Sequence, residues 1–322
     1  MPLKTHDSPP TIELTLPSSS SKASARIALF GATVTSWKSS DGQERLFLSE
    51  KTTLDGSSAV RGGIPIVFPV FGPPSDHEDN QGLENCPRHG FARTNWWHLQ
   101  TDHAVDGPVE GKDTATAVFL LDSKQVKGLT KEQYQWRHQL RYVVSLGEDS
   151  LTTSLQVAHV QDPEDDAKDL PPPMRFQALL HNYLAVPQQG SADASIFGLE
   201  GQSYLDKTES DATRKKTPKQ RSEKTPIQLK GAASDAVHLG PTPPQVTLQY
   251  PSGGVTLTRT TDSTPNTVLW NPAAEGNAGM KDLHADGWKD FVCIEPGKVV
   301  GFQELKVGQV WTASQTLSVT QQ

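Results

Sequence analysis

The stretch FVCIEPG, residues 291–297, places a single carboxylate after an apolar, strand-forming run. In a strand, Phe291, Cys293 and Glu295 share one face, because successive side chains alternate between the two faces. A carboxylate beside a buried run costs free energy unless another group pairs with it or the protein uses it. The Pro-Gly that follows predicts that the strand ends at Glu295, where loops meet a cavity. Glu295 is a candidate for proton transfer, or else a carboxylate that caps backbone N–H groups or pairs with an arginine.

A histidine stands inside a second apolar stretch, ALLHNYLAV, at position 181. In a strand, Leu179, His181 and Tyr183 share one face. A single histidine in an apolar strand is more often a satisfied core residue than a catalyst, yet imidazole is well suited to moving protons near neutral pH. The residue type therefore permits proton transfer at His181 without establishing it.

Two further stretches combine arginines with glycines or aromatic residues. AVRGGIPIVFPVFGPP places Arg61 before two glycines, which allow a tight turn and close approach of the backbone to a ligand. CPRHGFARTNWW places Arg88, His89 and Arg93 beside aromatic side chains. A guanidinium group binds a carboxylate, a phosphate or paired sugar hydroxyls. Both stretches fit an anionic sugar site, and each also fits ordinary arginines that pair with acidic neighbours or line an edge strand.

The motifs of several other enzyme classes are missing from the sequence. It contains no G-x-G-x-x-G, Walker A, G-x-S-x-G or H-E-x-x-H motif and no Cys-x-x-Cys pair. Histidines and cysteines do not cluster at the spacing of zinc ligands. We therefore expect no cofactor and no metal.

The segments that must position these residues have mostly the alternating pattern of β-strands. Residues 11–16 alternate, and residues 138–159 and 245–260 each predict two strands joined by a glycine-containing turn. The 24 prolines lie mostly between such runs, where they suit loops and hinder helices. The pattern predicts an antiparallel sandwich or barrel, with one short helix within 278–290.

Length and strand pattern predict one domain over residues 11–322, preceded by a flexible N-terminal tail, residues 1–10. Strand-like sequence resumes on both sides of the acidic segment 162–173 and of the charged segment 214–226. Both segments are therefore expected to be exposed loops rather than domain linkers.

Charge and cysteine content narrow the class of protein. The formal net charge of −7 argues against a general nucleic-acid-binding protein, which needs a broad basic surface. Two cysteines, Cys86 and Cys293, do not form a disulfide framework and fit a reducing cytosol. Neither a signal peptide nor a run of about 20 apolar residues is visible. We predict a cytoplasmic protein without a membrane or nucleic-acid partner, and a monomer by default.

Six motifs in order resemble those of a known family: RGGIPIVFPVFGPP, RHGFAR, ALLHNYLAV, SYLDKT, LWNP and FVCIEPG. They are similar to the glucose-6-phosphate 1-epimerases, or hexose-6-phosphate mutarotases, of the galactose-mutarotase-like superfamily. The resemblance spans roughly Thr11 to Val319. It implies a large antiparallel β-sandwich, the supersandwich, with a concave active face. It also implies exchange of the α and β anomers of glucose 6-phosphate, and possible action on other hexose 6-phosphates, without a cofactor.

The resemblance assigns proton transfer to two residues. His181 resembles the catalytic acid of the family and Glu295 its catalytic base. For this division of labour the imidazole should be protonated and the carboxylate ionised in the productive state. Mutual attraction between the two side chains is expected to favour that state if they face each other across the sugar.

The resemblance also implies substrate ligands. Arg61 and Arg93 correspond to groups suited to a 6-phosphate, Asp206 in SYLDKT to a ligand for sugar hydroxyls, and His89 to a substrate-side histidine of the superfamily. Arg88 is a departure, because relatives often carry glutamine there, and an added positive charge would suit a phosphate.

Two alternatives stay open at this point. One is an aldose 1-epimerase that acts on an unphosphorylated sugar, against which the arginine cluster argues. The other is a non-catalytic sugar-phosphate-binding protein, which would not need both His181 and Glu295. The inserts 76–86, 162–173 and 214–226 have no role assigned by the sequence.

Overall fold

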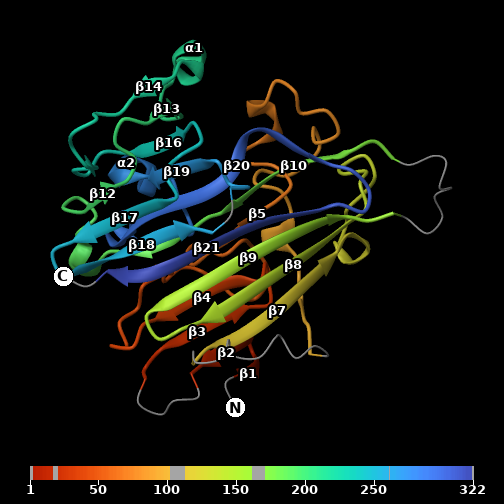
Figure 1. The fold of residues 1–322 in the computed structure, drawn as a ribbon, viewed down its shortest axis with the longest axis horizontal. Helices are drawn as coiled ribbons and strands as arrows, with labels where there is room; N and C mark the ends of the chain where they lie inside the picture. Colours follow the sequence, from red (N-terminus) through yellow and green to blue (C-terminus); the bar gives the residue numbers. More distant parts are fainter. Residues whose placement is uncertain (1–2, 17–20, 102–112, 162–170, 261, 321–322) are drawn as a thin grey trace.

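The computed structural model describes residues 3–16, 21–101, 113–161, 171–260 and 262–320, and its architecture is almost entirely β (Figure 1). Neighbouring named strands pair antiparallel throughout these residues. The strands form sheets of four, eight and nine members. The predicted all-β class is thereby confirmed.

The nine-stranded sheet is built from hairpins whose side chains alternate between core and surface. Residues 138–159 form two strands joined by a short turn, and residues 245–259 form two more, as the sequence predicted. In spatial order its strands are β15 (Ile227–Gln228), β12 (Ser195–Phe197), β17 (Gln245–Tyr250), β18 (Gly253–Arg259), β21 (Val310–Thr320), β9 (Ser150–His159), β8 (His138–Leu146), β7 (Ala115–Asp122) and β6 (His98–Leu99).

The eight-stranded sheet carries Glu295 and Asp206 on its strands, and His181 lies between two of them. Its central strands are buried on both faces, which explains their nearly continuous apolar sequences. In spatial order its strands are β14 (Lys219–Gln220), β13 (Ser203–Asp206), β16 (Ser234–His238), β19 (Asn266–Asn271), β20 (Phe291–Leu305), β10 (Met174–Leu180) and β5 (Ile66–Val67), with β11 (Tyr183–Ala185) also paired to β20.

The four-stranded sheet contains a correction to the predicted flexible tail. Leu3–Asp7 forms a strand that pairs with its neighbour from Leu3 opposite Leu14 to Asp7 opposite Pro10. The backbone groups of this segment are therefore satisfied by a ladder rather than by solvent. The strands of this sheet are β1 (Leu3–Asp7), β2 (Pro10–Thr15), β3 (Ser24–Ala28) and β4 (Thr33–Lys38).

Helices are short, and none within the described residues is long and apolar enough to cross a membrane. The predicted helix within 278–290 is displaced, because α2 ends at Ala278 and only a 3₁₀ turn follows, at Gly287–Asp290. The two α-helices are α1 (Ala212–Lys216) and α2 (Ala273–Ala278), and the 3₁₀ turns are η1 (Pro74–Asp76), η2 (Ala92–Thr94), η3 (Ser123–Gln125), η4 (Pro187–Gln189) and η5 (Gly287–Asp290).

The two segments expected to be loops differ in what the structure describes. In 214–226, the end of α1 is followed by the short strand β14, and most side chains of this segment are exposed. In 162–173, only residues 171–173 are described; they precede β10, and residues 162–170 lie outside the described residues.

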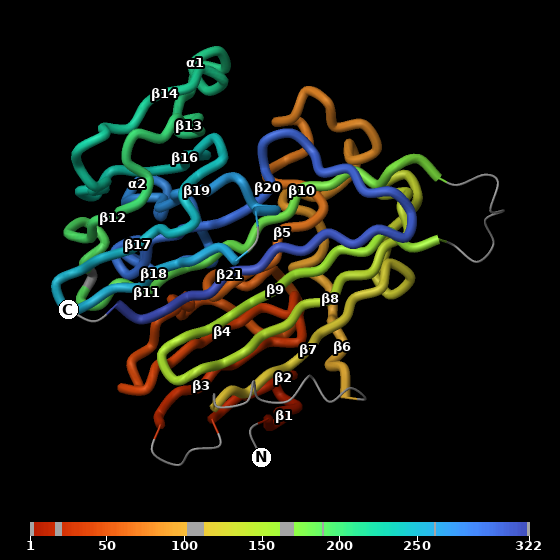
Figure 2. Tube along the Cα trace, viewed as in Figure 1, coloured from red at the N-terminus to blue at the C-terminus, as the bar shows by residue number. Residues whose placement is uncertain are grey.

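The two large sheets share one hydrophobic core. Phe176 of β10 packs edge-on against Trp311 of β21, with ring centroids 5.4 Å apart. The two longest strands, β20 and β21, are consecutive and belong to different sheets, so that the chain passes directly from one sheet to the other (Figure 2). The eight-stranded sheet therefore has a rigid apolar support behind the face that carries the polar residues.

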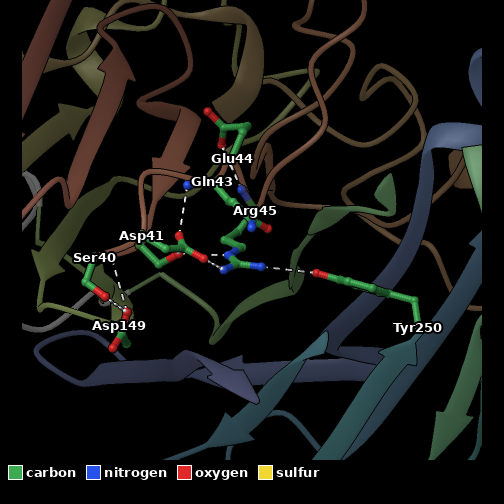
Figure 3. A network of polar contacts seen from close by, with 8 residues as sticks. Ser40, Asp41, Gln43, Glu44, Arg45, Asp149 and Tyr250 are labelled. Carbon is green, nitrogen blue, oxygen red and sulfur yellow. Dashed lines mark hydrogen bonds and ion pairs between the residues drawn. The ribbon is translucent and has the colours of Figure 1, made fainter. Parts of the chain in front are cut away.

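A buried polar network connects the segment after β4 to the nine-stranded sheet (Figure 3). The Arg45 side chain is only 4% exposed, and its guanidinium donates to Asp41 at 2.6 Å and to the Tyr250 hydroxyl at 3.4 Å. Nearby, Asp149 of the β8–β9 turn accepts from the backbone and the hydroxyl of Ser40 at 3.1 and 2.7 Å. These bonds join the segment that follows the four-stranded sheet to the nine-stranded sheet.

Candidate active site

The interruption between β10 and β11 brings His181 opposite Glu295. Tyr183 pairs with Cys293 on one side of the interruption, and Leu179 pairs with Gly297 on the other. The two pairings keep the same register, so the intervening His181 lies across from Glu295. Residues opposite each other in an antiparallel pair have side chains on the same face and in contact.

The predicted strand end at Glu295 is wrong. β20 continues through the Pro-Gly to Leu305, with Pro296 opposite Thr267 of β19 and Gly297 opposite Asn266. On its other side, the ladder with β10 begins only at Gly297, since the neighbouring chain is interrupted there. A proline is tolerated at this point because no ladder bond is required from its nitrogen. Glu295 therefore projects from the middle of a rigid strand.

Both members of the pair are buried, and they are close without being hydrogen-bonded. The His181 Nδ1 and Glu295 Oε1 atoms are 3.5 Å apart, and Glu295 is 1% exposed. Among the described residues, that nitrogen and both carboxylate oxygens lack a hydrogen-bond partner. The His181 ring stacks on Tyr183, with centroids 4.6 Å apart and planes within 8°. The pair is thus held in place by packing while its polar atoms stay available to a ligand.

Burial shifts the pKa values of both Glu295 and His181. It raises the pKa of Glu295, an effect that the neighbouring Asp235 increases. It also lowers the pKa of His181, which the nearby Arg61 and Arg93 lower further. The pair can hold its one shared proton in two ways. The proton lies either on Glu295, which leaves both groups neutral, or on His181, which gives the ion pair expected from the sequence. Desolvation of both groups therefore favours the neutral pair, with the shared proton on Glu295, and opposes the ion pair.

A cavity of about 310 Å³ opens in front of this pair. It brings together six of the seven side chains predicted from the sequence, namely His181, Glu295, Arg61, Arg88, His89 and Arg93. The cavity wall also includes Lys207, Asp235 and Trp270, none of which the sequence selected. An acid–base pair, four cationic groups, an extra carboxylate and an indole ring thus share one pocket.

Arg61 is anchored by two acidic or hydroxyl partners. It donates from Nη1 to the Tyr183 hydroxyl at 2.9 Å and from Nε to the Asp282 carboxylate at 3.0 Å. Electrostatic interaction with Tyr183 and Asp282 raises the pKa of Arg61 despite its burial. Its charge is permanent and its position is set by the same tyrosine on which His181 stacks.

The two arginines of RHGFAR are held differently. Arg93 donates to the Arg88 carbonyl at 3.1 Å, and burial lowers the pKa of Arg93 to about 10, which still leaves it protonated at neutral pH. Among the described residues, no carboxylate lies within ion-pair distance of either Arg88 or Arg93. These two charges are available to an anion that enters the pocket.

His89 is fixed by its backbone and kept neutral by its surroundings. Its φ of 63° is left-handed, and the N–H of Gly72 donates to its Nδ1 at 3.2 Å. The neutral ring therefore carries its proton on Nε2. Burial, followed by the charge of Arg93, lowers the pKa of His89. Gly90 is required here, because a Cβ atom at that position would meet the Phe68 carbonyl oxygen at 1.9 Å.

Asp206 is the one predicted ligand that does not line the pocket. Its carboxylate accepts from Lys219 at 2.7 Å and from the Thr208 N–H at 3.0 Å. Asp206 ends β13, whereas Asp235 lies on the adjacent strand β16, where residue 235 pairs with Trp270. The contact with sugar hydroxyls that the sequence assigns to Asp206 stays a prediction, and Asp235 is a second carboxylate inside the pocket.

The cross-strand rows explain how Asp235 comes to face the pocket. Asp235, Trp270, Cys293 and Tyr183 are successive partners across β16, β19, β20 and β11. Glu295, two residues beyond Cys293, lies on the same face in the adjacent row. Nothing in the segment around Asp235 marks it from sequence, because its row is set by pairing with strands far along the chain.

Lys207 directly follows Asp206, so its side chain takes the opposite direction to that of Asp206. Its ammonium lies 4.9 Å from the centroid of the Phe71 ring and 2.9 Å from an oxygen of Asp76. The sequence reasoning missed Lys207. Alternation of side chains along SYLDKT could have found it, because a residue next to Asp206 faces the opposite way.

A family model described as aldose 1-epimerase matches residues 14–318. The chain belongs to the aldose 1-epimerase family. A protein of Escherichia coli (strain K12), provisionally named glucose-6-phosphate 1-epimerase, is 30% identical to this chain over 274 residues. The aligned residues cover 84% of this chain and 78% of that protein. A protein of Cenchrus ciliaris with the same provisional name is 28% identical over 294 residues, which cover 91% of this chain and 80% of that protein.

Solved structures agree with the predicted sandwich. A Salmonella typhimurium protein, provisionally described as a mutarotase, matches with a TM-score of 0.77 at 24% identity, covering 99% of this chain and 93% of that chain. A galactose mutarotase-like protein from Clostridium acetobutylicum matches with a TM-score of 0.68 at 15% identity, covering 99% and 98%. The galactose-mutarotase-like fold, the isomerase class and anomer exchange as the reaction are thereby confirmed for this aldose 1-epimerase family member.

Proposed function

We propose that this epimerase exchanges the α and β anomers of a hexose 6-phosphate, with glucose 6-phosphate as the first candidate. The observation that carries the proposal is the pairing, in one pocket, of a buried acid–base pair with Arg61, Arg88, Arg93 and Lys207. A neutral sugar does not need four cationic groups. The provisional names of the Escherichia coli and Cenchrus ciliaris relatives point to the same substrate.

The phosphate is assigned to Arg88, Arg93, Arg61 and Lys207 together. Arg88 and Arg93 contribute charges without a carboxylate partner among the described residues, whereas Asp282 and Asp76 partly balance Arg61 and Lys207. Planar guanidinium groups match phosphate oxygens with two parallel donors, and a lysine adds a mobile point charge. A dianionic group would thus complete a site that has more positive than negative charge.

The sugar ring is assigned to the space between the phosphate group and the acid–base pair. Trp270 lines this space and offers an apolar surface to one face of the ring. Asp235, whose pKa burial raises, is placed to hydrogen-bond with ring hydroxyls. His89 adds its Nε2–H as a further donor. The phosphate then fixes the distance of C1 from the cationic end of the pocket.

Anomer exchange needs one base and one acid. The Glu295 carboxylate takes the proton of the C1 hydroxyl while the His181 imidazolium gives a proton to the ring oxygen. The bond from C1 to the ring oxygen breaks, C1 becomes an aldehyde, and rotation about the bond to C2 presents its other face. Closure returns both protons by the reverse steps, and each positioned proton-transfer group contributes roughly 10²–10⁴-fold.

The substrate itself can bring the pair into its working charge state. Desolvation favours a proton on Glu295, but hydroxyl groups that donate to the carboxylate stabilise its ionised form. The proton then moves to His181, only 3.5 Å away, without exchange with solvent. Binding of the sugar and activation of the pair are thereby linked.

Exchange spectroscopy by NMR on α- and β-glucose 6-phosphate, with and without protein, tests the proposal. We expect faster exchange with protein, and a kcat/KM for glucose 6-phosphate well above that for free glucose. Equal kcat/KM values would favour an epimerase for unphosphorylated sugars. Tight binding of glucose 6-phosphate without faster exchange would favour a sugar-phosphate-binding protein.

We also infer that the protein acts in the cytoplasm as a monomer, where the monomer is the default expectation. The support for the cytoplasm is the low cysteine content, which fits a reducing compartment. Light scattering of the purified protein tests the oligomeric state, and fractionation of the source cells tests the location.

A further inference from the structure

A thiol lies beside the acid–base pair, on the same face of β20. Cys293 is fully buried and occupies the cross-strand row next to that of Glu295 and His181. One ligand atom from each of these three residues, the Cys293 Sγ included, lies within 4.8 Å of the other two. Anomer exchange uses the carboxylate and the imidazole and has no use for the thiol. The proposed function therefore leaves the role of this thiol open.

The nitrogen and oxygen atoms of this group are not engaged elsewhere. Nδ1 of His181 and both oxygens of Glu295 have no hydrogen-bond partner among the described residues, although both side chains are buried. Buried polar atoms without partners are costly, and in native proteins they call for a specific explanation. Sulfur, imidazole nitrogen and carboxylate oxygen are together the ligand types that zinc accepts.

We propose that Cys293, His181 and Glu295 bind a thiophilic divalent cation, with Zn²⁺ as the reference ion, and that the bound ion inhibits the enzyme. The distance of 3.5 Å between His181 Nδ1 and Glu295 Oε1 is already suitable. Two ligands each about 2.1 Å from a tetrahedral zinc ion lie about 3.4 Å apart. The sulfur lies within 4.8 Å of each of them, so each distance must close by at most about 1.2 Å to reach the roughly 3.6 Å that zinc ligation requires. His181 and Glu295 both line the cavity, through which the ion enters.

Charge balance allows the ion to bind in a pocket that also holds arginines. Burial raises the pKa of both Cys293 and Glu295 and so favours the protonated form of each. Zn²⁺ replaces the thiol proton and the carboxyl proton, which leave to the buffer, and the ligands become thiolate and carboxylate. The net charge of the site is the same before and after. Binding of the ion therefore adds no net repulsion from the nearby Arg61 and Arg93.

Inhibition follows because the ion uses the atoms that transfer protons. A zinc-bound carboxylate is a weaker base, and an imidazole bound through Nδ1 can no longer exchange a proton with Glu295. This consequence rests on the proposed function, whereas metal binding itself does not. The two can fail separately, so the experiment measures them separately.

Binding is measured with Co²⁺, which reports thiolate ligation through an intense near-ultraviolet charge-transfer band, and then by displacement with Zn²⁺. The matched control is Cys86→Ser, which leaves Cys293 as the sole cysteine of the chain and removes a buried thiol whose Sγ donates to the Gln133 carbonyl at 3.1 Å. We expect one Co²⁺ per chain and the same band in the wild type and in Cys86→Ser. Absence of the band from a folded Cys86→Ser protein would overturn the proposal without any change at Cys293.

Two variants at the site, Cys293→Ala and Cys293→Ser, sharpen the result. Both should lose the band and bind Co²⁺ and Zn²⁺ at least tenfold more weakly. The zinc concentration that halves anomer exchange should rise by the same factor, relative to the uninhibited rate of each variant. Retention of the band in either variant would contradict the site. If the band is normal while zinc leaves anomer exchange unchanged, the site stands and the inhibitory role, together with the proposed acid–base pair, is wrong.

Discussion

The two ends of the pocket are built in opposite ways. At the inner end, Glu295 and His181 are positioned by the register of long strands and are surrounded by aromatic rings, with Tyr183 stacked on the histidine. At the outer end, Arg88 and Lys207 project from segments outside the strands. The inner end is buried and has polar atoms without hydrogen-bond partners among the described residues, and the outer end is rich in charge.

Because of this difference, we expect the inner end of the pocket to govern the rate of reaction and the outer end to govern the affinity for substrate. Desolvation at the inner end shifts the pKa of both groups and leaves their polar atoms without partners, which suits proton transfer. At the outer end, charges are partly balanced by Asp282 and Asp76, and solvent screens them. Changes at the inner end should therefore act on kcat, and changes at the outer end on KM.

The largest effect is expected for Glu295→Gln, which keeps the shape of the side chain and removes the base. The kcat for anomer exchange should fall by at least about a hundredfold, with a small change in KM. His181→Asn should act similarly. The double variant should be little worse than either single one, because the two residues act as a unit. Near-normal exchange by Glu295→Gln in NMR measurements would remove the residue from the mechanism.

The next effect is expected for Arg88→Met at the outer end. Loss of one charge-assisted contact should raise KM for glucose 6-phosphate by roughly tenfold or more, with little change in kcat and none for free glucose. Arg26→Met, on β3 with only the partner Glu13 at 3.5 Å, is the control for loss of a surface arginine. Equal changes for both sugars would argue against a phosphate contact.

Asp235→Asn tests the connection between carboxylates at the inner end. Desolvation favours a proton on Glu295 in the one-proton state of the pair, and loss of that proton at high pH should stop the reaction. Asp235 helps to raise the pKa of Glu295, so its removal lowers that pKa. The alkaline limb of the pH profile of kcat/KM should move to lower pH by roughly half a unit. An unmoved limb, or movement to higher pH, would contradict the assigned order of protonation.

A smaller effect is expected for Asp76→Asn. The carboxylate of Asp76 is 2.9 Å from the Lys207 ammonium, which also lies over the Phe71 ring. Removing its negative charge should lower KM for glucose 6-phosphate by about two- to threefold at low ionic strength, since exposed pairs contribute at most about 1 kcal/mol. Added salt should erase the difference. A rise in KM would mean that Asp76 positions Lys207 rather than competing for it.

The smallest effect is expected for Asp206→Asn. Its carboxylate pairs with Lys219 outside the pocket, so kcat and KM should each change by less than about twofold. The comparison with Asp235→Asn is direct, since the two aspartates lie on adjacent strands. A large rise in KM for Asp206→Asn alone would restore the original sequence-based assignment.

Much of the fold and most of the site could be predicted from local sequence. Alternation along residues 138–159 predicted a hairpin, and the apolar run before Glu295 predicted a buried strand. Both could be predicted because the order of apolar and polar residues along a short segment shows its period and its burial. Residue type selected His181 and the arginines, since few side chains move protons at neutral pH or bind anions. The extent of the first strand was missed, because the pairing of Leu3–Asp7 depends on a neighbouring strand rather than on its own composition.

Local sequence is enough for the class of fold and the reaction type, and it selects His181, Glu295 and the arginines as candidates for the acid, the base and the phosphate ligands. The tertiary contacts add that His181 lies opposite Glu295, that Asp235 rather than Asp206 lines the pocket, and that Cys293 lies beside the pair. The reason is physical: the register between strands is set by ladders that join segments more than a hundred residues apart in the chain. The directions of the pKa shifts at Glu295 and His181 also depend on the tertiary structure, because desolvation comes from neighbours that no local pattern reveals.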